Sequence, residues 1–522
     1  MPGPLTGRLA ARGPNGAAAC AHPLATRTAM DVLRSGGNAV DAAVAAGAVM
    51  CVVEPHTSQL GGDAFMLVRS GSDGRIHAIN ASGPAPGAAR ADSFRDAIPI
   101  RGFRSTTVPG ILAGWELAVR LFGTMPFGEL LHDAIGYAAN GAPVSRHLAA
   151  AVEAHRPVIE GFESTKAVLM PHGRAPRVGE ILIQPELADS LRLLAIGGPD
   201  DFYKRSLAER LSAFMAAKGG DISLDDLWEY VPALLEPLSA EWRGYKVHVQ
   251  PPVSQAHVML EALLVTEPLV DPSSGPQDPA WLHACVEAIK LAFADRFAYS
   301  GDPSVVEDVT DKLLAPQFVA QRRACIDPER ARQHTAGALP DTDTTQLAVA
   351  DSRGNAITLI QSLFHGFGCG VMVEGTGILL NNRLTGFELD PTHPNALEPG
   401  KRPMHTLCTY FATRDGEIAL LGGSPGGMRQ VQTNLQTCAS VLGFGDDPQT
   451  AVERPRWAIG DGLELFMEDE FGGAMACLAS LGHDVKPQPR LGVGGCAQLI
   501  AREGPVYAAG SDPRGDGHAE AF

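Results

Sequence analysis

The chain has 522 residues, of which 45% are hydrophobic and 19% are charged, an ordinary composition for a globular protein with a large core. Its formal net charge of −17 excludes the basic face that a nucleic acid or an anionic membrane surface requires of its partner. Nine scattered cysteines, odd in number and without a C-x-x-C pair, argue against a disulfide framework and favour a reducing compartment.

The N-terminal stretch Met1–Arg8 has no basic segment followed by an apolar one, and no apolar run reaches membrane-spanning length. We therefore expect a cytoplasmic protein. Helical periodicity follows in several segments of the first half of the chain. These segments are 24–53 with a stop at Gly36-Gly37, an Ala-rich second helix from Asn38 to Ala46, 125–220, and 278–335 with an amphipathic helix from Trp281 to Arg296.

Two strands interrupt the helices, at 63–69 and 75–81, joined by the turn Gly71-Ser72-Asp73-Gly74. Ala331–Asp343, which contains a glycine and a proline, breaks the helical pattern and predicts an exposed loop or linker. Short strands dominate the rest of the chain. We expect strands at 345–350, 356–363 after a turn at 351–355, 377–380 and 417–421, and a helix at 428–442. Strands in both halves favour an α+β or layered α/β/α fold.

Thr344 is the candidate nucleophile, in the junction Asp343-Thr344-Thr345-Gln346. A threonine at a chain N-terminus carries its own base, because the free α-amine has a pKa of about 7.7–8.0 and can take and return the hydroxyl proton. An internal threonine has no such amine, so this chemistry requires a cut between Asp343 and Thr344. Taken alone, the Thr-Thr pair is more typical of the start of a β-strand.

The surroundings of this junction contain further motifs. In the second half they are Thr344-Thr345-Gln346, Val349-Ala350-Asp351 with Gly354-Asn355-Ala356, Gly375 to Asn382, Lys401-Arg402-Pro403, Gly423 to Gly427, and Ser511 to Arg514. In the first half they are Gly36 to Ala43, Glu54-Pro55 with Gly61-Gly62, and Val108-Pro109-Gly110. Each motif is weak alone, but in this order, along nearly the whole chain, they resemble the γ-glutamyltranspeptidase family.

The resemblance implies an α+β fold, a four-layer αββα N-terminal-nucleophile hydrolase sandwich, formed by a proenzyme that cuts itself. Residues 1–343 would become the large subunit and residues 344–522 the small subunit, together one unit. Thr344 would form an acyl-enzyme from a small-molecule amide and pass the acyl group to water or to an amine. The family's hydroxyl partner of the nucleophile falls on Ser362.

The family's oxyanion donors fall on the backbone N–H groups of Gly426 and Gly427. Adjacent glycines before a helix suit this role, because two N–H groups can reach one oxygen and the helix dipole favours negative charge. Gly422 to Gly426 also fits the nucleophile elbow of α/β-hydrolases. That alternative requires an N–H on the residue after the serine, and Pro425 has none.

The family's clamp for the α-carboxylate and α-amino groups of a γ-glutamyl substrate is missing. Its arginine falls on Ser82, which cannot make the bidentate pair that an arginine makes with a carboxylate. Its paired serines fall on His405 and Thr406, its asparagine on Phe364 and its ammonium-binding aspartate on Gly386. We therefore predict an amidohydrolase for a different acyl group, as in the family's cephalosporin-acylase-like and oxamate amidohydrolase members.

The altered substrate-binding residues are Ser82, Phe364, His405, Thr406 and Arg383. His405 either meets an anionic substrate group or is structural. Arg383 either supplies a displaced positive charge or is a surface or structural arginine. Phe367 and His365 are further candidates for the lining of the pocket.

Two alternatives stay open at this point. The first is a true γ-glutamyltransferase or glutathione hydrolase with a rebuilt clamp, and the second is an unprocessed, inactive relative that acts as a binding protein. The histidines lack metal-binding spacing and the mechanism needs no cofactor, so we expect no metal and no cofactor. The acyl substrate, hydrolysis against transfer, and dimerisation of the two-chain unit are not determined by the sequence.

Overall fold

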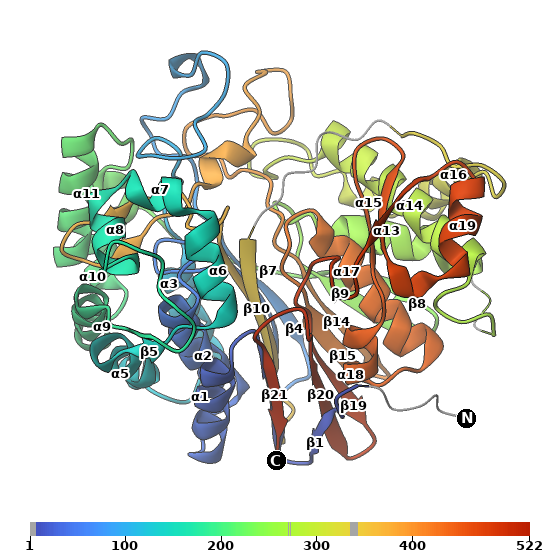
Figure 1. Cartoon of the computed structure of the whole chain (residues 1–522), viewed down its shortest axis with the longest axis horizontal. Helices are drawn as coiled ribbons and strands as arrows, with labels where there is room; N and C mark the ends of the chain where they lie inside the picture. Colours follow the sequence, from blue (N-terminus) through green and yellow to red (C-terminus); the bar gives the residue numbers. More distant parts are fainter. Residues whose placement is uncertain (1–6, 270, 272, 335–342) are drawn as a thin grey trace.

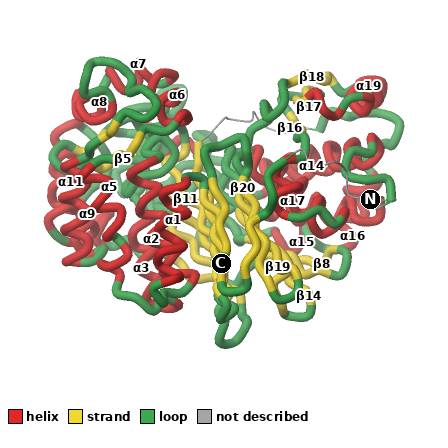
Figure 2. Tube along the Cα trace, turned by 60° about the horizontal axis from the view of Figure 1, so that its bottom comes forward, coloured by secondary structure: helices red, strands yellow, loops and turns green. Residues whose placement is uncertain are grey.

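Two seven-stranded sheets lie face to face between two layers of helices (Figures 1 and 2). The computed structural model describes residues 7–269, 271, 273–334 and 343–522. Helices from the first half of the chain cover one sheet, and helices from the middle and the end cover the other. This is the expected α+β class and the four-layer αββα sandwich.

The first sheet has the strand order β21-β2-β10-β11-β3-β4-β7 and is antiparallel throughout. Its strands are β2 (Gly16–Cys20), β3 (Asp63–Arg69), β4 (Ile76–Ala81), β7 (Ala233–Leu235), β10 (Asp343–Asp351), β11 (Ala356–Phe364) and β21 (His518–Ala521). The hairpin of β10 and β11 is therefore central, with neighbours on both sides.

The second sheet has the order β1-β20-β19-β15-β14-β9-β8 and is also antiparallel. Its strands are β1 (Ala11–Gly13), β8 (Leu238–Trp242), β9 (Tyr245–Val249), β14 (Thr409–Arg414), β15 (Glu417–Gly423), β19 (Gln498–Glu503) and β20 (Val506–Ser511). Three smaller sheets complete the strands: β5 (Ala142–Pro143) with β6 (Ile181–Leu182), β12 (Met372–Val373) with β13 (Ile378–Leu379), and β16 (Trp457–Ile459), β17 (Glu464–Glu468) and β18 (Asp484–Gln488).

The residues of β10 show why the layers form. Leu347 and Val349 pack in the core under the helices, whereas Ala348 and Ala350 belong to the core between the two sheets. Successive side chains of a strand point to opposite faces, so a strand that is apolar at every position is buried on both. The small alanines permit close approach of the sheets, and larger groups such as Phe411 fill the remaining space.

The helices divide between the two outer layers. On the first sheet lie α1 (Pro23–Arg34), α2 (Ala39–Val53) and α3 (Ile111–Phe122), and on the second lie α13 (His257–Thr266), α14 (Pro279–Tyr299) and α17 (Arg429–Cys438). The others are α4 (Phe127–Leu130), α5 (His132–Asn140), α6 (Arg146–Ala154), α7 (Arg156–Glu160), α8 (Glu163–Leu169), α9 (Pro185–Gly197), α10 (Asp200–Lys204), α11 (Ser206–Lys218), α12 (Leu224–Trp228), α15 (Thr310–Leu313), α16 (Pro316–Ala324), α18 (Pro448–Glu453) and α19 (Gly473–Ser480). None of the helices in these described ranges has the length and apolar character that crossing a membrane requires.

Several sequence expectations need correction. The segment 281–296 is helical but not amphipathic: α14 is buried on nearly all sides because α13, α16 and α19 pack around it. The helix expected at 428–442 ends at Cys438 and continues as a π-helical turn, Ala439–Gly443. In the predicted loop Ala331–Asp343, Ala331 is buried and Asp343 begins β10, and residues 335–342 lie outside the described residues.

The start of α2 shows how a sequence motif becomes structure. Asn38 Oδ1 accepts hydrogen bonds from the N–H groups of Val40 (2.9 Å) and Asp41 (3.0 Å), and Asp41 Oδ2 accepts from Asn38 N (2.8 Å). This capping box satisfies N–H groups that the first turn of a helix leaves without partners. Asp351 Oδ2 accepts from Ala39 N at 3.0 Å, so the turn of the central hairpin is tied to the same helix end.

We expect Asn38→Ala to lower the free energy of unfolding by about 1–2 kcal/mol, because it removes the cap acceptor. Asn38→Ser is the matched control, since serine keeps an acceptor at the cap position. The measurement is the urea midpoint of the three proteins. Equal losses in both variants would contradict a capping role for Asn38.

Candidate active site

Thr344 lies at the start of β10, opposite a bulge in β11. Asp343 pairs with Phe364 and Thr345 pairs with Gln361, so the single residue Thr344 faces two residues of β11, Ser362 and Leu363. Such bulges change the direction of a side chain and are common beside functional groups. Thr344 is only 4% exposed.

The hydroxyl of Thr344 has two polar neighbours. Its Oγ1 donates to Ser362 Oγ at 3.2 Å and accepts from Gln430 Nε2, on α17, at 3.3 Å. Ser362 Oγ also accepts from Phe364 N at 2.8 Å. The predicted pair Thr344 and Ser362 is therefore in contact, and a helix that covers the second sheet supplies a further hydrogen bond to the Thr344 hydroxyl.

Gly426 and Gly427 lie between the end of β15 and the start of α17, with φ angles of 114° and 56°. These positive angles favour glycine. Among the described residues, the N–H groups of both glycines donate no hydrogen bond. The carbonyl of Gly427 accepts from Gln430 N at 3.1 Å. The glycine turn is therefore bonded to the residue whose side-chain amide contacts Thr344.

The structure does not support the nucleophile elbow at Ser424. Its side chain is completely buried, and its Oγ donates to Pro425 O at 2.9 Å. A Cβ added at Gly495 would come within 2.5 Å of that oxygen, so Gly495 covers the hydroxyl closely. An elbow serine must instead present its hydroxyl at the top of the sheet.

The side chain of Ser82 is hydrogen-bonded to the nearby residue Asn80. Its Oγ donates to Asn80 Oδ1 at 2.6 Å and its N–H donates to the same oxygen at 2.9 Å. Its carbonyl accepts from Tyr230 Oη (3.2 Å) and from Arg402 Nε (3.1 Å). The hydroxyl at the position of the family's arginine therefore has a structural partner.

Arg383 is completely buried, so its interpretation as a surface arginine is wrong. Its Nε donates to Asp63 Oδ2 at 3.4 Å, and its guanidinium lies 4.1 Å above the ring centre of Phe364. Burial lowers the pKa of Arg383 to about 10, against the opposing effect of Asp63. Phe364 itself has a φ of 84°, a strained value for a residue with a side chain.

His405 and Thr406 are both buried, at 0% and 3% exposure. The ring of His405 packs against Phe65 at a centroid distance of 5.1 Å. Burial and the nearby arginines lower the pKa of His405 well below its ordinary value, so its ring is neutral near pH 7. Gln255 Nε2 donates to both Thr406 O (2.8 Å) and Gly427 O (3.1 Å), which joins this segment to the glycine turn.

Sequence reasoning missed Asp63, Gln255 and Gln430. Asp63 follows the motif Gly61-Gly62 and begins an otherwise apolar strand. A charged residue at such a position is rarely buried without a partner, so the sequence could have indicated Asp63 as a site residue. The two glutamines stand in segments without any motif, and only the folded chain shows their contacts. The ring of His365 lies 4.4 Å from that of Phe364, and His365 Nδ1 is paired with Asn382 Nδ2 at 2.8 Å. The ring of Phe367 packs instead against His56 and His155.

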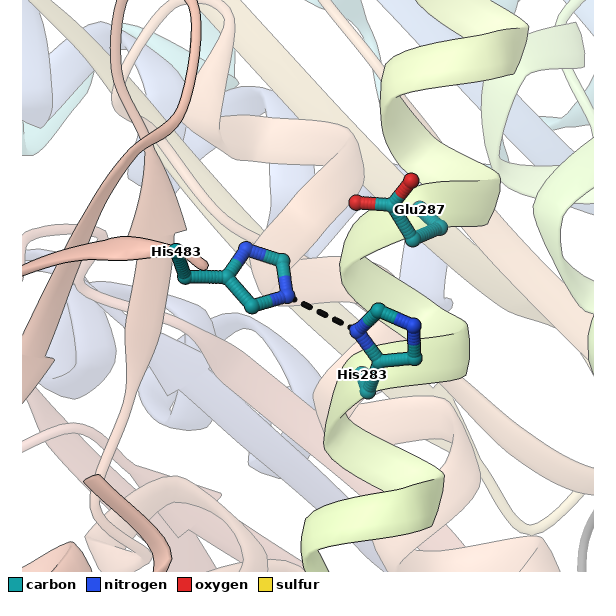
Figure 3. A group of neighbouring side chains, drawn as sticks. All are labelled: His283, Glu287 and His483. Atoms are coloured by element: carbon teal, nitrogen blue, oxygen red, sulfur yellow. Dashed lines mark hydrogen bonds between the residues drawn. The ribbon is translucent and has the colours of Figure 1, made fainter. Parts of the chain in front are cut away.

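A second cluster of polar side chains lies away from Thr344. Figure 3 shows the rings of His283 and His483 facing each other, 2.8 Å apart at their nearest nitrogens, with Glu287 one turn along α14. Burial raises the pKa of Glu287, but His334 and Lys290 outweigh it and lower the value to about 2. Glu287 is paired with both of these groups, so we interpret the cluster as structural: it fixes the chain segment at His334 to α14.

Comparisons with known proteins agree with this geometry. The family model for γ-glutamyltranspeptidase matches residues 25–522. The chain belongs to the γ-glutamyltranspeptidase family. It is 36% identical to the oxamate amidohydrolase proenzyme of Klebsiella pneumoniae, over 97% of this chain and 98% of that protein. It is 34% identical to the glutathione hydrolase-like YwrD proenzyme of Bacillus subtilis, over 95% and 97%.

A solved structure of cephalosporin acylase from Bacillus halodurans superimposes on this family member with a TM-score of 0.93. That protein is 35% identical in sequence, and the match covers 100% of this chain and 98% of the acylase. The protein is therefore an enzyme of the γ-glutamyltranspeptidase family with an N-terminal-nucleophile hydrolase fold. Its relatives include amidohydrolases and acylases as well as glutathione hydrolases.

The ion pair of Asp63 predicts a pH dependence of stability. Burial raises the pKa of Asp63 to about 6, although Arg383, Arg402 and the N–H of Gly83 all act in the opposite direction. The nearby phenols of Tyr203 and Tyr230 are uncharged over this range, because burial raises the pKa of each. An unfolded aspartic acid titrates at about 3.9, so the folded protein binds more protons between about pH 4 and 6.

The contribution of Asp63 to stability is therefore present below about pH 4 and is lost as the pH rises through about 6. We expect the free energy of unfolding of the wild type to fall across this window relative to that of Asp63→Asn. Urea denaturation at several pH values measures the difference between the two curves. Parallel curves would contradict a raised pKa for Asp63.

Proposed function

We propose that this chain is a proenzyme that cuts itself before Thr344 and then hydrolyses an amide whose acyl group is not γ-glutamyl. The observation that carries the proposal is the contact of Thr344 Oγ1 with Ser362 Oγ at 3.2 Å. In the nearby turn, the N–H groups of both glycines have no acceptor among the residues that the structure describes. The residues in the proposed catalytic roles are Thr344 as nucleophile, Ser362 as its hydroxyl partner, and Gly426 and Gly427 as oxyanion donors.

The first reaction is the cut. Thr344 Oγ1 adds to the carbonyl carbon of Asp343, the peptide C–N bond breaks, and an ester links the two residues. Water hydrolyses this ester, which leaves a carboxylate on Asp343 and a free α-amine on Thr344. Residues 1–343 and 344–522 are then the large and small subunits of one αββα unit.

The second reaction uses the new α-amine as the base. It takes the proton of Thr344 Oγ1 as this oxygen adds to the substrate carbonyl, and it returns the proton to the leaving amine. The N–H groups of Gly426 and Gly427 stabilise the oxyanion in this step. Water, or an amine in a transfer reaction, then releases the acyl group from Thr344.

The altered clamp residues and the names of the relatives support an acyl group other than γ-glutamyl. The hydroxyl of Ser82 is held by Asn80, and Gly386 offers no side chain for an ammonium group. A relative 36% identical is named as an oxamate amidohydrolase, and the similar solved structure is a cephalosporin acylase.

We place this enzyme in the cytoplasm as part of the proposal. All nine cysteines are free thiols, and six of them are buried. Free buried thiols are typical of proteins that fold in a reducing compartment.

We expect the purified wild type to separate, under denaturing conditions, into two fragments that meet between Asp343 and Thr344. Thr344→Ala removes the nucleophile, so the variant should remain one chain. Thr345→Ala is the matched control, because it removes a neighbouring threonine hydroxyl and leaves the nucleophile in place. Mass spectrometry of the intact proteins measures the outcome. A wild type that stays whole, or a Thr344→Ala variant that is cut, would overturn the proposal.

Ser362→Ala should slow both the cut and amide hydrolysis by about 10–100-fold, the effect of losing one hydrogen bond to a reacting hydroxyl. Ser362→Thr keeps a hydroxyl at this position and should retain most of the activity. The rates are measured by the appearance of fragments over time and by ammonia or amine release. Equal activity of the alanine variant and the wild type would remove Ser362 from the mechanism.

A further inference from the structure

Gln430 of α17 holds its side-chain amide in one orientation beside the Thr344 hydroxyl. Its Oε1 accepts from the N–H of Cys408 at 2.9 Å, and its Nε2 donates to Thr344 Oγ1 at 3.3 Å. A backbone N–H can only donate, so the amide oxygen must face Cys408 and the NH2 group must face Thr344. Gln430 is completely buried, so both contacts are shielded from bulk water.

The segment that Gln430 bonds is itself fixed to α17. Cys408 lies directly before β14, and its carbonyl accepts from Asn434 Nδ2 at 3.1 Å. Asn434 is one helical turn after Gln430, so two side chains of α17 bond the N–H and the C=O of one residue. The main-chain N–H of Gln430 donates to Gly427 O at 3.1 Å. The donor at Thr344 is therefore preorganised and loses little side-chain freedom during a reaction.

The two contacts of Thr344 Oγ1 have opposite directions. Oγ1 donates its proton to Ser362 Oγ and accepts a hydrogen bond from Gln430 Nε2. A carboxamide N–H does not take up the hydroxyl proton, so Gln430 is not the base of the reaction. It can instead stabilise negative charge on Oγ1, because a preorganised donor in a buried site acts more strongly on a charged oxygen than on a neutral one.

Negative charge collects on Oγ1 when the acyl group is released. In the proposed mechanism, water adds to the ester carbonyl carbon and gives a proton to the α-amine of Thr344. The bond between that carbon and Oγ1 then breaks, its electron pair stays on Oγ1, and the α-ammonium gives the proton to this oxygen. In the attack that forms the ester, by contrast, a donor on Oγ1 engages an electron pair of the attacking oxygen. The hydrogen bond from Gln430 thus favours the release of the acyl group over its capture.

We propose that Gln430 is a catalytic residue for acyl release: its Nε2–H group donates to Thr344 Oγ1 as this oxygen leaves the acyl carbon. This inference rests on the proposed function, in which Thr344 is the nucleophile. One short segment then serves both oxygens of the reacting ester, because Gly426 and Gly427 are the proposed donors to its carbonyl oxygen. Gln430 acts alike on the ester of a substrate and on the ester that joins Asp343 to Thr344 during the cut.

The cut before Thr344 tests this role without any added substrate. Full-length chains made by cell-free synthesis are sampled over time, denatured, and analysed by mass spectrometry with or without brief treatment with hydroxylamine at neutral pH. Hydroxylamine splits an ester at Thr344 but not a peptide bond there, so it reveals chains that have formed the ester and not released it. Thr344→Ala, which forms no ester, is the blank.

In Gln430→Met we expect hydrolysis of this ester to be about 10–100-fold slower than in the wild type, the effect of losing one hydrogen bond to a reacting oxygen. Chains that are whole without hydroxylamine and split before Thr344 with it should therefore accumulate. A purely structural role of Gln430 would not produce this form, because a chain that is merely misfolded keeps its peptide bond.

Two further variants separate chemistry from structure. Gln430→Glu keeps an acceptor for the N–H of Cys408, but its ionised carboxylate has no proton to donate to the leaving oxygen, so the same ester should accumulate. Gln432→Met is the matched control. Gln432 is a completely buried glutamine of the same helix, whose side chain bonds Ile459 N (2.8 Å) and Met428 O (3.2 Å) instead of the nucleophile. This variant should be cut as the wild type is, without a form that is sensitive to hydroxylamine.

The outcomes separate the two proposals. A wild-type chain that remains whole would overturn the role of Thr344. A wild type that is cut, with Gln430→Met cut at the same rate, would overturn only the role of Gln430. The same holds if the Gln430→Met and Gln430→Glu chains remain whole and resist hydroxylamine, because they would then fail before the ester forms.

Discussion

The hairpin of β10 and β11 carries Thr344 at one end and the turn at Asp351 at the other. Its register brings Thr344 opposite Ser362 and Leu363, and at this bulge the Thr344 and Ser362 hydroxyl oxygens lie 3.2 Å apart. Because the hairpin is central in the first sheet and buried on both faces, a slip of one residue would turn every apolar side chain to the wrong layer. The candidate site therefore depends on a register that the two cores enforce.

Local signals were enough to predict the central hairpin, the strands at 63–69 and 75–81, and the Ala-rich helix that begins near Asn38, because each depends on residues that are near in sequence. The pairing of Thr344 with Ser362 was also predictable, from motif order. The burial of Arg383 was not, since it depends on an aspartate on β3 and a ring on β11. The misjudged helix α14 has the same cause: only the folded chain shows that other helices enclose it.

The charge pattern around Thr344 differs from that of a clamp for a zwitterion. A γ-glutamyl group carries both a carboxylate and an ammonium, so its recognition needs opposite charges side by side. Here Arg383 is paired with Asp63, His405 is neutral, and Gly386 offers no carboxylate at the position of the family's aspartate. The Asp63–Arg383 pair is also costly to bury, because both groups lose their contact with water.

The strand order has a consequence for assembly. Each sheet contains strands from both sides of Thr344 in the sequence. The early strand β2 lies between β21 and β10, and the early strand β1 pairs with β20. Under the proposed cut before Thr344, the two chains would be held together by hydrogen-bonded strand pairs that formed while they were one polypeptide. The lifetime of the folded two-chain molecule would then depend on a high barrier to unfolding. The two polypeptides would no longer have the covalent connection that brought their segments together in the first folding. We would therefore expect a processed molecule, once unfolded into its two chains, to refold less readily than the uncut precursor.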